Sequence, residues 1–92
     1  MTEDRASTLA LQVLAWLVAQ DELLPVFLGA SGAGLDDLRA GAGNPALQGA
    51  VLDFVLMDDA WVTSCAGAIA AGDGDLAVAR QMLPGGALPN WT

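Results

Sequence analysis

Residues 9–19 read LALQVLAWLVA, a run that is apolar at every position except Gln12. As a helix this run would be apolar nearly all round, which is typical of a helix at the centre of a domain rather than at its edge. A membrane-spanning helix needs roughly twenty apolar residues, so we do not expect this run to cross a membrane. The run predicts a central helix over about residues 3–19.

A similar pattern returns 38 residues later, so the chain reads as a duplicated unit covering residues 7–40 and 45–78. Expected helix starts and stops also coincide, and a period of this length is typical of repeat architectures. We therefore predict a single domain over residues 1–92, a compact all-α six-helix bundle. Two pseudo-symmetric three-helix repeats would pack through the first and fourth helices. Identical pairs include Leu9/Leu47, Val13/Val51, Leu14/Leu52, Asp21/Asp59, Gly29/Gly67, Ala30/Ala68, Gly34/Gly72, Asp37/Asp75 and Leu38/Leu76.

Capping residues and glycines set the expected helix ends. Asn44 followed by Pro45 is a preferred start for the fourth helix. Gly32 or Gly34 in the first copy, and Gly72 in the second, would supply the left-handed residue that stops a helix. After the first helix, the expected helices cover residues 21–31, 35–40, 46–57, 59–71 and 75–83.

A tail over residues 84–92 follows the last expected helix. It opens with Pro84-Gly85-Gly86, which must break that helix. Trp91 is large enough to dock into a groove, whereas terminal residues often fray. Both interpretations of the tail stay open.

The charged residues are strongly unbalanced. The 92 residues carry 11 carboxylates against three arginines, a net charge of −8, and no histidine. Binding to phosphates needs clustered cations, so we expect neither nucleic acid nor a membrane as a partner. Residues 1–8 hold Glu3, Asp4 and a single cation, Arg5, whereas a secretory signal begins with a positively charged segment. We therefore predict a cytoplasmic protein. The lone Cys65 is expected to be a buried structural thiol.

Most of the carboxylates have a structural explanation. Ten of the 11 stand in pairs at expected helix starts, where a carboxylate caps free N–H groups and meets the positive end of the helix dipole. We therefore do not assign them as catalytic acids. The pairs are Glu3/Asp4, Asp21/Glu22, Asp36/Asp37, Asp58/Asp59 and Asp73/Asp75.

Asp53 is the exception, because it lies in the middle of the fourth expected helix, where the first copy has Ala15. Burying a carboxylate alone is very costly, so Asp53 should either face water or pair with an arginine. Small residues around it would either let a partner helix approach closely or meet another helix inside the monomer. The candidate interaction surface consists of Asp53, Ala46, Gly49, Ala50 and Met57.

Several kinds of chemical site are excluded. Asp73-Gly74-Asp75 resembles part of a calcium loop, but the chain has no glutamate after Glu22 to close it. One cysteine and no histidine cannot form a structural zinc site, a Ser–His pair or a Cys–His pair. The segments at 34–38 and 72–76 look like the attachment motif of acyl carrier proteins, but both lack its serine. We expect no catalytic site, metal or cofactor.

Four segments together resemble a known family: residues 22–28 (ELLPVFL), 34–39 (GLDDLR), 51–56 (VLDFVL) and 83–86 (LPGG). The chain resembles, from about residue 10 to 86, a family of short alphaproteobacterial proteins, domain of unknown function 3572. The resemblance implies a bacterial cytoplasmic protein with an all-helical fold. It brings no active site, and residues 1–8 and those after 86 lie outside it.

These observations favour a non-catalytic protein–protein interaction or accessory module whose partner is another protein or a second copy. Few usable catalytic groups and abundant apolar residues, 54% of the chain, support this hypothesis. The alternative is that the seam between the two repeats binds a small apolar ligand, as helical bundles can.

Overall fold

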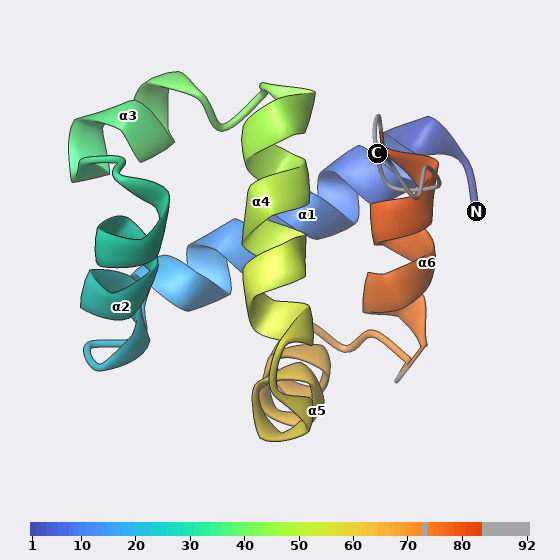
Figure 1. Ribbon diagram of the computed structural model, residues 1–92. Helices are drawn as coiled ribbons and strands as arrows, with labels where there is room; N and C mark the ends of the chain where they lie inside the picture. The colour runs from blue at the N-terminus through green and yellow to red at the C-terminus, as the bar shows by residue number, and fades with distance from the viewer. Residues whose placement is uncertain (73, 84–92) are drawn as a thin grey trace, which may run out of the picture.

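A computed structural model describes residues 1–72 and 74–83, in which six helices are joined by turns and loops, with no strand among these residues. The all-helical prediction is confirmed. Asp73 and the tail over residues 84–92, with Trp91, lie outside the described residues. The helices run α1 Glu3–Val18, α2 Leu23–Ser31, α3 Leu35–Ala40, α4 Pro45–Leu56, α5 Asp59–Ala68 and α6 Asp75–Met82 (Figure 1).

Side-chain caps explain where three of the helices begin. Thr2 Oγ1 accepts a hydrogen bond from the Arg5 N–H at 3.1 Å before α1, and Asn44 Oδ1 accepts from Ala46 N–H at 2.8 Å before α4. Asp58 Oδ1 accepts from Ala60 N–H at 2.8 Å at the start of α5. The expected cap of α2 is not observed, because that helix begins at Leu23 and the Glu22 side chain makes no capping hydrogen bond.

Local structure repeats between the two halves of the sequence. Asp37 Oδ2 accepts from the Gly34 N–H at 2.8 Å, and Asp75 Oδ2 accepts from the Gly72 N–H at 2.9 Å. In each half a carboxylate thus reaches back three residues to stabilise the start of a short helix. The pairs of buried residues repeat too, with Val13/Val51, Leu14/Leu52, Trp16/Phe54, Leu17/Val55 and Leu38/Leu76 buried in both copies.

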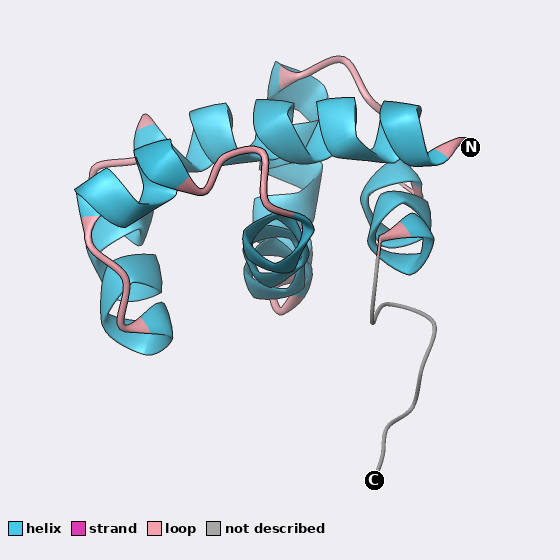
Figure 2. Ribbon diagram, turned by 90° about the horizontal axis from the view of Figure 1, so that it is seen from above, coloured by secondary structure: helices cyan, strands magenta, loops and turns pink. Residues whose placement is uncertain are grey.

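The core is organised around α1, as predicted. This helix contacts α2, α4, α5 and α6, and the expected contact between the first and fourth helices is confirmed. In Figure 2, α4 and α6 are seen nearly end-on, side by side along the same side of α1. No single helix in the described residues is long and apolar enough to span a membrane. The α1 side chains that are buried are Ala6, Leu9, Ala10, Val13, Leu14, Trp16 and Leu17.

The predicted pseudo-symmetric arrangement of the two repeats is not confirmed. The last helix, α6, packs against both α1 and α4, whereas its counterpart α3 does not pack extensively on either of them. In Figure 1, α2 and α3 lie on one side of α4 and α6 lies on the other. The two halves therefore share local structure, but they contribute unequally to the core.

A buried glutamine that the sequence analysis missed joins the loop before α4 to α1. Gln48 is only 3% exposed. Its Nε2 donates to the Ala42 carbonyl at 2.9 Å and to Ser7 Oγ at 3.0 Å. A buried amide is tolerated only when its polar atoms are paired, so these contacts fix how α4 enters the core beside α1.

The end of α5 differs from the prediction. Gly32 has the expected left-handed conformation after α2, with φ of 73°. In the second copy the left-handed residue is Ala70, with φ of 58°, and not Gly72. Ala70 stands 38 residues after Gly32, so the duplicated turn is kept although the glycine is missing. The Ala71 N–H donates to the Ala66 carbonyl at 2.8 Å, which closes the helix end.

Replacing Ala70 by glycine should therefore stabilise the protein. An L-residue in the left-handed region is strained through its Cβ, and glycine removes that strain, although it also loosens the unfolded chain. We expect Ala70→Gly to raise the free energy of unfolding by roughly 0.5–1 kcal/mol in urea denaturation. The reciprocal variant Gly32→Ala should lower it by a similar amount. A loss of stability in Ala70→Gly would contradict the assigned conformation.

Candidate functional site

Four of the residues of the candidate interaction surface form a stripe along one side of α4. Ala46 is exposed, Ala50 is half-buried, and Asp53 is exposed. Met57, at the end of the helix, is 76% exposed, the highest value among the exposed large apolar residues in the described part of the chain. The spacing of these residues, three or four apart, places them on one helical face.

Gly49 does not belong to this accessible stripe. It is buried, and a Cβ built on it would lie 3.1 Å from both Cζ and Nη1 of Arg80. The guanidinium of α6 therefore lies directly over the glycine backbone. At Gly49 an outside helix cannot approach, because α6 of the same chain already occupies that place, and the alternative of a contact inside the monomer holds there.

Asp53 is both exposed and paired. Its Oδ1 accepts from Arg80 Nε at 2.7 Å, with the Asp53 side chain 58% exposed and the Arg80 side chain 18% exposed. This outcome agrees with the expectation of an exposed or arginine-paired role. Gly49 and Asp53 are four residues apart on α4, so the glycine makes room for the guanidinium that the carboxylate binds.

A shallow apolar hollow of about 270 Å³ lies beside this stripe, between α2 and α4. Its floor is aromatic, because the rings of Phe27 and Phe54 meet edge to face at 5.3 Å, and Phe54 stacks on Trp61 at 5.0 Å. The Asp53 carboxylate lies at its edge, so the hollow pairs an apolar floor with a negative charge. It is lined by Phe27, Ala30, Ser31, Ala50, Asp53, Phe54 and Met57.

The seam between α1 and α4 is filled by side chains. Val13, Leu17, Val51 and Val55 are fully buried along it. The hollow between α2 and α4 lies between a helix of the first repeat and a helix of the second. The alternative hypothesis, a small apolar ligand in the seam between the two repeats, therefore stays a prediction.

The one thiol is inert. Cys65 is fully buried in α5, and burial raises the pKa of its thiol from 9.0 to about 11. A thiol must lose its proton to act as a nucleophile, so Cys65 remains protonated near neutral pH. No group of three or more histidine, cysteine or acidic side chains placed to hold a metal ion occurs in residues 1–72 and 74–83.

The family model of DUF3572, described as a protein of unknown function, matches residues 3–86. The chain belongs to this family. The match begins earlier than the sequence resemblance indicated, in agreement with the start of α1 at Glu3. Searches of curated proteins and of solved structures found no match to this DUF3572 protein.

Arg80 and its close fit against Gly49 were not predicted from the sequence. Arg80 lies 27 residues from Asp53, and no local pattern connects the two. One signal was available: 38 residues after Leu11, Ala15 and Ala42 the chain has glycine, aspartate and arginine, the last pair lying two residues beyond the copies. Three differences that fall on two neighbouring segments could have indicated a paired substitution.

We predict that alanine stabilises the protein at Gly29 but not at Gly49. Nothing lies within 4 Å of a Cβ built on Gly29, so Gly29→Ala should stabilise α2 by about 0.5–1 kcal/mol through helix propensity. Gly49→Ala should lose that gain, because Arg80 must move away from Asp53. In an Arg80→Ala background the gain at Gly49 should return. Equal gains at both glycines in the wild type, measured by urea unfolding, would contradict the close contact.

We also predict that the protein loses stability at alkaline pH because the Cys65 thiol ionises. The chain contains no lysine, tyrosine or histidine, so few other groups titrate in this range. The thiol ionises near pH 9 when unfolded and near pH 11 when folded, so the unfolded state holds fewer protons between these values. The contribution of the protonated thiol to the free energy of unfolding should be fully present below pH 9. The free energy of unfolding should then fall by roughly 2–3 kcal/mol as the pH rises to 11. In Cys65→Ala this fall should vanish, and parallel curves for the two proteins would refute the assignment.

Proposed function

We propose that this DUF3572 protein is a non-catalytic interaction module that binds another protein through the outer face of α4. The observation that carries the proposal is Met57, which is 76% exposed at the edge of a hollow with a floor of Phe27 and Phe54. A large flexible apolar side chain beside an aromatic hollow is an arrangement that binds partner side chains well.

Charge suggests what kind of partner would bind. The chain carries a net charge of −8, and Asp53 stands at the edge of the hollow. The negative electrostatic potential of these charges favours a partner with an apolar side chain flanked by lysine or arginine. The same potential opposes the close approach of a second copy. A different protein is therefore the preferred partner over self-association.

The pairing of Asp53 with Arg80 would hold this charge in a fixed position. A carboxylate held at 2.7 Å by an arginine loses less side-chain entropy when a partner arrives. Its 58% exposure leaves oxygen lone pairs available to the cation of a partner.

The sequence and the buried thiol both support a role without catalysis. The chain has no histidine or lysine for acid–base chemistry near neutral pH, and Cys65 stays protonated. We further propose a bacterial cytoplasmic setting in the alphaproteobacteria, as the sequence resemblance implies. No nucleic acid or membrane is expected as a partner, for the reason of charge.

A capture experiment with matched variants tests the proposal. We expect tagged wild type to retain one protein from a native bacterial lysate in stoichiometric amount. Met57→Ala and Ala50→Arg should lose that protein, because the first removes the exposed anchor and the second fills the hollow with a charge. Val78→Ala, which shortens another exposed apolar side chain on α6, should keep it. Equal retention by Ala50→Arg and wild type, or a single monomeric species that captures nothing, would overturn the proposal.

A further inference from the structure

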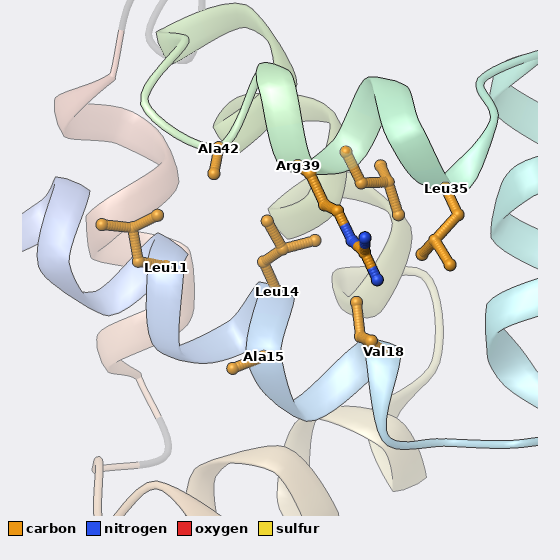
Figure 3. A pocket seen from close by; sticks show the side chains of 8 residues that line it. Leu11, Leu14, Ala15, Val18, Leu35, Arg39 and Ala42 are labelled. Carbon is orange, nitrogen blue, oxygen red and sulfur yellow. The ribbon is translucent and has the colours of Figure 1, made fainter.

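A second hollow, of about 300 Å³, lies between α1 and α3 and is almost entirely apolar (Figure 3). Three of its residues, Leu11, Val18 and Leu35, are among the exposed large apolar side chains, at 41%, 39% and 40% exposure. Apolar side chains that gather around one hollow mark a binding surface more strongly than side chains scattered singly. The lining consists of Leu11, Leu14, Ala15, Val18, Leu35, Leu38, Arg39 and Ala42.

Comparison of the two copies explains why this hollow exists. The residues 38 positions after Leu11, Ala15 and Ala42 are Gly49, Asp53 and Arg80. In the second copy the Arg80 guanidinium lies over Gly49 and binds Asp53, which joins α6 closely to α4. Ala42, two residues beyond the first copy, has no side chain long enough to do this, and α3 does not pack extensively on α1. The corresponding space is left without an internal side chain to fill it.

One cation stands at this hollow. Arg39 on α3 reaches across the mouth between Leu35 and Val18 (Figure 3). The described residues show no hydrogen bond or ion pair to its guanidinium. The neighbouring Asp37 carboxylate is used by the Gly34 N–H at 2.8 Å, and Asp36, on the same helix, is exposed. In a chain of net charge −8, an arginine at an apolar hollow favours a ligand that combines an apolar body with one negative group.

The length of the hollow limits the size of the apolar body. Its wall on α1 extends from Leu11 to Val18, and seven residues of an α-helix rise about 10 Å. A volume of about 300 Å³ lies at the small end of the range for ligand pockets. A flexible unbranched chain of medium length fits this space better than a helix of a partner protein, which would need a longer groove.

We propose that the α1–α3 hollow binds a free carboxylic acid with a medium-length acyl chain. The chain would lie along Leu11, Leu14 and Val18, and the carboxylate would pair with Arg39. This site is separate from the α2–α4 surface assigned above to a protein partner, so either proposal can fail without the other.

Decanoate titrated into the ¹⁵N-labelled full-length protein, below the micelle concentration, tests this site by NMR, with 1-decanol as the neutral probe. We expect saturable amide shifts concentrated at residues 11–18 and 35–42. For wild type, decanoate should bind about two- to fivefold more tightly than 1-decanol, the range of an exposed ion pair. For Arg39→Gln, whose shorter polar side chain carries no charge, the two probes should bind equally.

A filling variant and its control locate the site independently of charge. Ala15→Leu places a larger side chain in the hollow and should weaken decanoate binding by roughly tenfold, equivalent to about two methylene groups no longer buried. Ala77→Leu makes the same change at an exposed position on α6 and should leave binding unchanged. Shifts centred on Phe54 and Met57, shifts that do not saturate, or equal binding by Ala15→Leu and wild type would each overturn the proposal. If Ala15→Leu does not fold, the comparison of decanoate with 1-decanol on wild type and Arg39→Gln still tests the proposal.

Discussion

The need to cover an almost wholly apolar α1 governs the rest of this fold. Seven of its side chains are buried, and α4 and α6 lie side by side along it. A chain of 92 residues buries only a small hydrophobic core, so each helix that packs on α1 contributes a large share of the free energy of unfolding. The part of α1 that these helices do not cover, at Leu11 and Val18, forms one wall of the α1–α3 hollow. The packing of the core and the position of this candidate site thus follow from one constraint.

The duplication is preserved in local structure and changed in packing. Capping by Asp37 and Asp75 and the left-handed turns at Gly32 and Ala70 repeat between the halves, because each depends on residues close in sequence. Helix packing depends on which side chains meet across larger distances, and there the copies differ. The contact of Arg80 with Gly49 and Asp53 brings α6 close to α4, and the first copy has no equivalent contact. A few substitutions on facing helices can therefore change the contacts of a duplicated unit while its helices remain.

The sequence predicted the helices and the central helix because hydrophobic patterning and capping act over short distances. It did not predict that Ala70 would replace glycine at the end of α5, since the retained turn overrides the preference for glycine at that position. Nor did it identify Gln48 as buried, because its hydrogen-bond partners, Ser7 and the Ala42 carbonyl, lie beside it only in the folded chain. For the candidate surface, the exposure of Met57 could not be read from sequence, and Gly49 was misjudged because the arginine that covers it comes from α6. The features that were not predicted are those that depend on residues far apart in the sequence.

Native-state hydrogen exchange tests most directly whether the packing of α1 on α4 and α6 is the core on which everything else depends. Our account predicts that amides around Val13–Leu17, Val51–Val55 and Leu76–Ala79 exchange most slowly and with one common opening free energy, equal to that of global unfolding. The amides of α3, which packs little on α1 and α4, should exchange at lower opening free energies. Exchange of α1 well before α4 and α6, or protection of α3 equal to that of α1, would contradict it.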